Sequence, residues 1–413
     1  MELKPGYKLT DVGVIPEDWD VKPLKALLAR SRLGGNYANQ ETETSYPLMK
    51  MGNLDRGFFD VSKVEYVKAG AVPDEVDRLR YGDLLFNTRN TLDLVGKVAI
   101  WADELPVAYY NSNLLRLEFD PELVPSPWYA NAVFNSHSCL VRLRGLATGT
   151  TSVAAIYGRD LWKLQFVIAP LAEQRAIAGA LSDVDALIGA LDQLLAKKRD
   201  LKQAAMQQLL TGHQRLPGFA PANPRFQQTD VGEIPEDWEV ERIRPLAAIT
   251  TGSRNTQDRI EDGAYPFFVR SSTVERINSY SFDGEAVLTA GDGVGTGKVF
   301  HYINGKFDIH QRVYKISDFS PRLVGRFFFL VFSTRFYDRI MSMTAKSSVD
   351  SVRMDMIANM PIPLPSPAEQ TAIAEVLSDM DAELAALEQK RDKTRLLKQG
   401  MMQELLTGRT RLI

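Results

Sequence analysis

Side chains suited to reading nucleic-acid bases gather in two stretches of this chain, around residues 86–113 and 252–312. Arginine can pair with guanine through two hydrogen bonds, and asparagine or glutamine can pair with adenine in the same way. The candidates are Asn87, Arg89, Asn90, Lys97 and Asn111 in the first stretch, and Arg254, Asn255, Gln257, Lys298, His310, Gln311 and Arg312 in the second. Similar clusters occur on ordinary polar surfaces, so both interpretations stay open.

Two hydroxyl-rich segments could contact phosphate groups, which position a protein on DNA without reading its sequence. Residues 147–153 read ATGTTSV, and residues 344–350 read TAKSSVD and include Lys346. Their composition would also suit an ordinary exposed loop.

Signals of catalysis are weak. Segment 290–299 (AGDGVGTGKV) would need glycine at Asp292 and a hydroxyl residue at Val299 to form a nucleotide-binding P-loop. Its glycines suit a turn or a close approach of the backbone to a ligand. The nuclease-like DVK at 20–22 becomes EVE at 239–241. One cysteine and four histidines without metal-ligand spacing argue against a metal enzyme. We expect neither a catalytic nor a metal site.

Bulk composition narrows the class of protein. The net charge of −3 and the pI near 6.0 argue weakly against duplex binding by this chain alone, so basic partners could share the contact. The N-terminus lacks an apolar signal-peptide core, and no long apolar run occurs. We therefore predict a cytoplasmic location.

Three short blocks occur twice along the chain. Residues 10–19 match residues 229–238 at 9 of 10 positions, 172–188 match 368–384 at 11 of 17, and 201–212 match 397–408 at 9 of 12. The enclosed inserts share far less, apart from a faint skeleton (GKVAI with GKVFH, NLLRLE with RVYKIS). A duplicated frame with divergent inserts suggests one scaffold that presents two reading heads. Trp19 and Trp238, which end the first block, are interpreted as core anchors.

The second and third blocks predict two long helices. Apolar residues repeat every three or four positions, which is the spacing of a coiled-coil seam. The seam residues are Ile177, Leu181, Val184, Ile188 and Leu191 in the first copy, and Ile373, Leu377, Met380, Leu384 and Leu387 in the second. Residues 172–210 would span about 58 Å as a helix, which favours pairing of the two helices. The alternative is that each helix packs only on its own domain.

The chain resembles the specificity subunits of type I DNA restriction–modification systems over essentially its whole length. The resemblance is carried by PLAEQ (170–174) and PSPAEQ (365–370), which open the two helices, and by LLTG (209–212 and 405–408), which closes them. The order of frame, insert and helix, repeated twice, supports it.

The resemblance implies an α/β (α+β) fold in which two globular target-recognition domains are joined by two long antiparallel coiled-coil helices. The expected segments are recognition domains at 1–168 and 229–364, helices at 169–212 and 365–413, and a linker at 213–228. Each recognition domain would read one half of an asymmetric, bipartite DNA site, and the helices would set the spacer.

The resemblance also implies the partners and cofactors of the chain. The helices would dock two methyltransferase subunits, which bind S-adenosylmethionine, and restriction subunits would add ATP- and Mg²⁺-dependent cleavage. The chain itself would carry no cofactor. Two alternatives remain: a nucleotide-dependent enzyme built around residues 291–298, and a coiled-coil adaptor for proteins.

Overall fold

The computed structural model describes residues 5–293, 295–343 and 351–413, and the chain forms two compact units. Unit 1 combines residues 1–192 with 389–413, and unit 2 consists of residues 193–388. Both units mix helices and strands, which confirms the predicted α/β content. Among the described residues, no helix could cross a membrane and no cluster of ligating side chains could hold a metal ion.

Unit 1 is built on a four-stranded sheet of order β4-β12-β8-β10, whose strands are β4 (Leu28–Leu33), β12 (Leu114–Phe119), β8 (Leu84–Asn87) and β10 (Val98–Ile100). A second sheet contains β5 (Asn39–Gln40), β6 (Pro47–Met49), β7 (Glu65–Val67) and β11 (Tyr109–Tyr110). A third contains β9 (Arg89–Asn90), β13 (Thr148–Gly149) and β14 (Ala154–Ala155). Short 3-10 turns are η1 (Leu24–Leu27), η2 (Met51–Asn53) and η3 (Glu75–Asp77).

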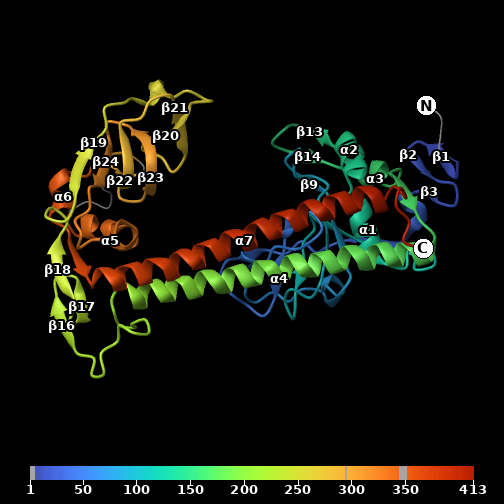
Figure 1. Cartoon of the computed structure of the whole chain (residues 1–413). Coiled ribbons are helices and arrows are strands. Elements are labelled where there is room, and N and C mark those ends of the chain that lie inside the picture. The colour runs from blue at the N-terminus through green and yellow to red at the C-terminus, as the bar shows by residue number, and fades with distance from the viewer. Residues whose placement is uncertain (1–4, 294, 344–350) are drawn as a thin grey trace. The chain divides into compact units, whose positions relative to one another are not determined.

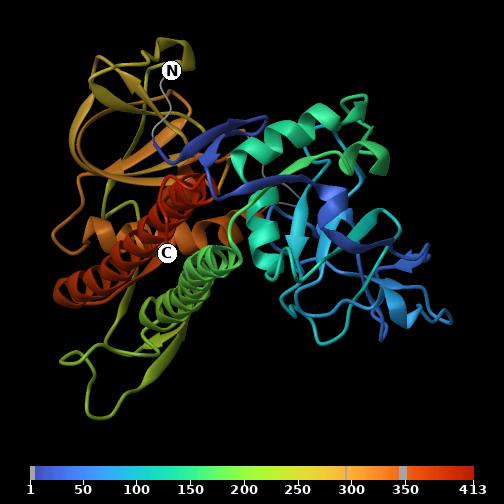
Figure 2. The ribbon, with the colours of Figure 1, turned by 90° about the vertical axis from the view of Figure 1, so that its right-hand side faces the viewer.

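The helices of unit 1 are α1 (Pro127–Phe134), α2 (His137–Leu146) and α3 (Gly158–Leu161), drawn in teal in Figure 2. Helix α1 contacts β10 and α2, and α2 contacts α3. Phe86 from β8 and Phe134 from α1 are fully buried in the same core, because both elements present apolar side chains to the space between them.

Unit 2 is built on a six-stranded sheet of order β19-β24-β22-β23-β20-β21. Its strands are β19 (Ala248–Thr251), β20 (Tyr265–Phe268), β21 (Val274–Ile277), β22 (Phe282–Ala290), β23 (Phe300–Ile309) and β24 (Val313–Ser317). Helix α5 (Gly325–Ser342) contacts β22 and β23 with Phe328, Phe332 and Phe336, which recur every four residues and form one buried face. Helix α6 (Met354–Ala358) and the 3-10 turn η4 (Thr256–Asp258) complete the unit.

The repeated frame adopts the same pairing in each unit. In unit 1, β1 (Tyr7–Thr10) pairs with β2 (Gly13–Pro16), and β3 (Asp20–Pro23) pairs with β15 (Gln165–Ile168). In unit 2, β16 (Phe226–Thr229) pairs with β17 (Gly232–Pro235), and β18 (Glu239–Arg242) pairs with β25 (Pro361–Leu364). Trp19 and Trp238 are both buried, which confirms their role as core anchors.

Two helices of 39 residues each, α4 (Leu171–Leu209) and α7 (Pro367–Leu405), are the longest elements of the chain (Figure 1). Both helices lie within the predicted segments, and the end of each belongs to a different unit from its beginning. The seam residues Ile177, Leu181, Leu191, Ile373 and Leu377 are buried, and Val184, Ile188, Met380, Leu384 and Leu387 are half-buried.

Ion pairs show that the helix segments run antiparallel within each unit. In unit 1, Asp185 pairs with Lys398 at 2.6 Å, and Asp192 pairs with Arg395 at 3.0 Å. In unit 2, Lys198 pairs with Glu383 at 2.7 Å, and Lys202 with Asp381 at 2.5 Å. In both units the residue number falls on α7 as it rises on α4. Helix α4 therefore supplies the acids in unit 1 and the bases in unit 2.

A buried glutamate near the start of each long helix is held by the frame. In unit 1, Glu173 accepts the indole N–H of Trp19 at 2.9 Å and the Nε–H of Arg411 at 2.7 Å. Arg411 also forms two hydrogen bonds with Asp18, at 3.0 and 2.7 Å. This set of four residues is called the unit 1 clasp below, and it ties residues 18–19 to the segment that follows α7.

Unit 2 repeats the arrangement with Glu369, Trp238, Arg215 and Asp237, the unit 2 clasp. Arg215 falls in the stretch 213–228, which was predicted as a linker, and its side chain is nearly buried. That stretch therefore packs on unit 2 at Arg215 and also contributes the first residues of β16. The predicted domain boundaries remain predictions about which segments fold independently.

Candidate nucleic-acid interface

Two loops of unit 2 meet at one end of its sheet. Loop 252–258 follows β19, and turn 310–312 joins β23 to β24. The backbones of Arg254 and His310 form a bridge, and the Gln311 N–H donates to the Arg254 carbonyl at 2.8 Å. Gly252 permits this approach, because a Cβ there would lie 2.0 Å from the Ile309 carbonyl oxygen. The structure thus brings together five predicted candidates: Arg254, Asn255, His310, Gln311 and Arg312.

Several side chains of this loop cluster are engaged with one another. The Gln311 amide donates to Oδ1 of Asn255 at 2.6 Å. Nε of Arg254 lies 3.3 Å from Oδ2 of Asp308, a fully buried carboxylate that also accepts from the Ser279 hydroxyl at 2.8 Å. Arg254 therefore compensates a buried negative charge, whatever else it contacts.

Two further charged residues complete the cluster, and neither was among the DNA-contact candidates from the sequence. Oδ1 of Asp292 lies 3.0 Å from Nη1 of Arg270, and Oδ2 lies 3.6 Å from Nε of Arg312. Arg270 follows β20 and Asp292 follows β22, so only the folded sheet places them beside the turn at 310–312. No local spacing in the sequence marks this group.

His310 is a structural part of the turn. The residue is 5% exposed, and Nδ1 of its ring accepts the backbone N–H of Arg312 at 3.0 Å. Burial, and after it the positive charge of Arg270, lower the pKa of His310, so the ring stays neutral at pH 7. A neutral ring that accepts at Nδ1 carries its proton on Nε2. His310 is therefore not a cationic contact, and its main role is to order the turn.

The remaining candidates of unit 2 lie elsewhere or outside the described residues. Gln257 is exposed in η4, and Lys298 is exposed with its ammonium 5.1 Å from the centre of the Tyr337 ring. Lys346 lies outside the described residues. In the described part of the glycine-rich segment, the Lys298 N–H donates to the Gly295 carbonyl at 3.0 Å as in a turn, and a Cβ at Gly295 would lie 2.4 Å from the Arg270 carbonyl oxygen. This agrees with the interpretation of its glycines as turn and close-approach residues.

In unit 1 the candidate Asn87 does not fit a direct contact with DNA. Its side chain is 0% exposed, and Oδ1 accepts the backbone N–H of Arg89 at 3.2 Å. The prediction that Asn87 reads a base is therefore corrected: Asn87 shapes the backbone at the end of β8. The sequence could not show this, because a polar residue after a strand can face either the core or solvent.

Arg89 and Asn90 lie beside the hydroxyl-rich segment 147–153, whose composition suits either phosphate contact or an ordinary exposed loop. They form β9, which pairs with β14, and the Leu92 N–H donates to the Thr151 carbonyl at 3.1 Å. Arg89 is exposed, whereas Asn90 is half-buried and its side chain accepts the backbone N–H of Thr91 at 2.8 Å. The structure thus places an exposed guanidinium next to exposed hydroxyl groups.

Lys97 and Asn111 have local partners. Nζ of Lys97 lies 3.2 Å from Asp55, and only 18% of the Lys97 side chain is exposed. Oδ1 of Asn111 accepts the backbone N–H of Asn113 at 3.2 Å. Both residues therefore stabilise the fold, and the structure gives them less freedom to read bases than the sequence suggested.

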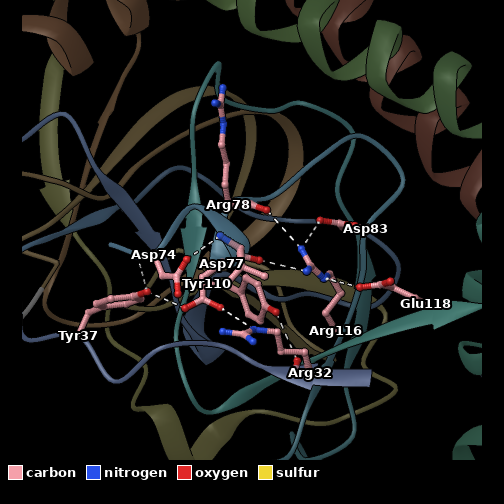
Figure 3. A network of polar contacts seen from close by, with 10 residues as sticks. Arg32, Tyr37, Asp74, Asp77, Arg78, Asp83, Tyr110, Arg116 and Glu118 are labelled. Carbon is pink, nitrogen blue, oxygen red and sulfur yellow. Dashed lines mark hydrogen bonds and ion pairs between the residues drawn. The ribbon is translucent and has the colours of Figure 1, made fainter. Parts of the chain in front are cut away.

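A network of charged groups supports the loop after β4 in unit 1 (Figure 3). Asp77, almost fully buried, accepts the Tyr37 hydroxyl at 2.6 Å and pairs with Arg32 at 3.2 Å. Burial and the hydrogen bond to Asp77 raise the pKa of Tyr37 to about 12. Arg116 pairs with Asp83 at 3.2 Å. These charged groups pair with one another inside unit 1, as Arg254 pairs with Asp308 inside unit 2.

Comparison with known proteins identifies relatives of this chain. Residues 235–396 match the family described as the type I restriction modification DNA specificity domain. A putative type I restriction enzyme MjaX specificity subunit of Methanocaldococcus jannaschii is 25% identical over 422 residues, which cover 98% of this chain and 97% of the relative. The type I restriction enzyme EcoDI specificity subunit of Escherichia coli is 31% identical over 176 residues, which cover 43% of this chain and 38% of the relative.

Solved structures share the fold. The S subunit of the type I restriction–modification system from M. genitalium has a TM-score of 0.65 at 15% identity, covering 98% of this chain and 99% of that chain. A chain from a study of complex assembly and conformational transition of the type I R-M system has a TM-score of 0.52 at 16% identity, covering 95% of this chain and 99% of that chain. Over nearly its whole length this chain is therefore similar to type I restriction–modification specificity subunits, and residues 235–396 match the DNA specificity domain of that family.

Proposed function

We propose that this chain selects the DNA site of a type I restriction–modification complex, with each unit reading one half of a bipartite, asymmetric sequence. The observation that carries the proposal is a shared sheet with unlike polar loops. The strand order β4-β12-β8-β10 of unit 1 corresponds to β19-β24-β22-β23 of unit 2. At the strand ends unit 1 presents Arg89 and unit 2 presents Arg270, Asp292 and Arg312.

The proposal assigns the long helices to two tasks. As an antiparallel coiled coil, α4 and α7 would fix the length of the non-specific spacer and dock two methyltransferase subunits. The antiparallel ion pairs in each unit support this assignment. Of the buried seam residues, Ile177, Leu181, Ile373 and Leu377 also pack in the cores of the two units. The proposal further includes a cytoplasmic location for the chain. The methyltransferase subunits would bind S-adenosylmethionine, and two restriction subunits would use ATP and Mg²⁺. The net charge of −3 supports the sharing of DNA contacts with basic partners.

An exchange of the second insert tests the proposal. Replacing residues 244–364 with the corresponding insert of another family member is expected to change one half of the methylated site and to leave the other half intact. The reason is that the insert carries the loops of unit 2, whereas the loops of unit 1 are untouched. Methylated adenines are mapped in cells that carry the chimaera and its methyltransferase. A simultaneous change in both half-sites would contradict independent reading.

Single substitutions in unit 2 give a finer prediction. Arg312→Ala is expected to weaken binding of the cognate duplex by about 1–3 kcal/mol and to relax specificity in one half-site. Affinity of the assembled methyltransferase is measured for cognate and single-mismatch duplexes at two salt concentrations. Arg244→Ala is the matched control, because Arg244 is also exposed and paired with a carboxylate, Asp355, away from the loop cluster. Arg254→Ala is a poorer test, since it also leaves buried Asp308 without its cation.

A further inference from the structure

We infer that one backbone position, occupied by Arg89 in unit 1 and Asp292 in unit 2, determines how each half-site is read, and that Asp292 is a positioning residue for Arg270 and Arg312. The inference rests on the proposed function, because it concerns the bases that the two units recognise. It goes beyond that function in naming the position where the two readers differ and the base that the second reader selects, which is guanine.

The register of unit 1 defines the position. Leu114, the first residue of β12, pairs with Asn87, the last residue of β8. Thr88 follows Asn87 along the chain, and its carbonyl accepts the Ile156 N–H at 3.0 Å. Arg89 follows as the first residue after that contact, and its side chain is exposed.

Unit 2 repeats the register with different side chains. Val313, the first residue of β24, pairs with Ala290, the last residue of β22. The next carbonyl, that of Gly291, accepts the Val352 N–H at 2.7 Å. Asp292 follows, so it stands at the backbone position that Arg89 holds in unit 1. One register position therefore carries a cation in one unit and an anion in the other.

The contacts of Asp292 show what the anion does. Each of its two oxygens faces one arginine, with Nη1 of Arg270 at 3.0 Å and Nε of Arg312 at 3.6 Å. Because Arg312 turns Nε toward Asp292, its two terminal nitrogens remain available, and 66% of its side chain is exposed. His310 fixes the Arg312 backbone through the hydrogen bond to Nδ1. The Arg270 side chain and the Arg312 backbone are thus held before any ligand binds, and the exposed Arg312 side chain lies within ion-pair distance of Asp292.

An arginine held in this way suits guanine. A guanidinium can donate two hydrogen bonds to N7 and O6 of guanine in the major groove, and a carboxylate that contacts the guanidinium from the protein side reduces the conformational freedom that is lost on binding. Phosphate contact needs no such orientation, and a carboxylate beside a phosphate would oppose it. In unit 1, exposed Arg89 has no ion-pair partner within the described residues, so its own guanidinium can donate hydrogen bonds to a base.

The variant Asp292→Asn tests the inference in the full-length chain assembled with its methyltransferase. Discrimination between the cognate duplex and duplexes in which guanine of the second half-site is replaced is expected to fall by about tenfold, the order of one bidentate contact. Affinity for a non-cognate duplex should stay equal or rise, since a negative charge is removed. Asp292→Glu should recover part of the discrimination, and Arg89→Ala should affect only the other half-site.

The outcomes separate the possible roles of Asp292. Unchanged discrimination in a folded Asp292→Asn variant would overturn the inference. So would an equal loss of cognate and non-cognate affinity together with a lower unfolding temperature, because that result describes a purely structural ion pair. If the wild-type assembly itself shows no sequence preference, the proposed function fails, and the inference fails with it.

Discussion

Replacing Arg411 with alanine is expected to lower the free energy of unfolding of unit 1 by about 3 kcal/mol, the low end for breaking a buried ion pair. Glu173 is 0% exposed and would keep only the indole N–H of Trp19 as a partner. The low end applies because a third of the Arg411 side chain is already exposed. Hydrogen exchange measured on peptides 165–181 reports on unit 1, and peptides 365–377 report on unit 2.

Three companion variants make this prediction specific. Arg409→Ala is the matched control, since Arg409 is mostly exposed and its pair with Glu404 should contribute less than about 0.5 kcal/mol. Arg215→Ala should destabilise unit 2 in the same way, because Arg215 pairs with buried Glu369. Adding Glu173→Gln to Arg411→Ala should restore part of the stability by removing the uncompensated charge. If peptides 165–181 exchanged hydrogen equally fast in Arg411→Ala and Arg409→Ala, the result would contradict a stabilising role of the unit 1 clasp.

Inserting four residues into α4 after Leu195 is expected to abolish methylation of the original site and to move it to a site with a longer spacer. Helix α4 is continuous through this point, so the insertion adds about 6 Å at roughly 1.5 Å per residue. B-DNA rises about 3.4 Å per base pair, which allows one or two additional base pairs. The bases of both half-sites should stay the same, because no loop residue is altered. Sites are identified by mapping methylated adenines.

A paired insertion sharpens the experiment. A second insertion of four residues after Glu388 in α7 keeps Asp192 opposite Arg391 and Arg395 in unit 1, and the pairs of unit 2 stay in their own register. The double variant should therefore methylate the longer site more efficiently than the single variant. An active single or double variant with an unchanged spacer would count against the helices as a ruler.

The frame and the helices were predictable because their signals are local and repeated. Trp19 and Trp238 end blocks that match at 9 of 10 positions, and both are buried. The three-four spacing that includes Ile177 and Ile373 identified the faces that the two helices bury. What spacing could not show is that Arg215 and Arg411 each hold a buried glutamate, because that depends on residues 154 and 238 positions away.

The site was only partly predictable, for physical reasons that differ between residues. Gln311 and Arg312 belong to one short turn, so their proximity follows from sequence alone. Asn87 has the right chemistry for reading adenine, yet it is buried. Residue type alone does not show whether a side chain at the end of a strand points to the core or to solvent. Asp292 is negatively charged and so was not a candidate for DNA contact. Its inferred role depends on its ion pairs with Arg270 and Arg312.

The unit 1 clasp has a consequence for the order in which the chain folds. Unit 2 is contiguous, so all of residues 193–388 are synthesised before residues 389–413. Unit 1 needs that later segment, since Tyr7 donates to the Gly408 carbonyl across 401 positions and Arg411 binds Glu173. Closing so long a loop is slow compared with local pairing. The unit whose synthesis begins first is therefore completed last, because unit 1 requires Arg411 whereas unit 2 requires no residue beyond Glu388.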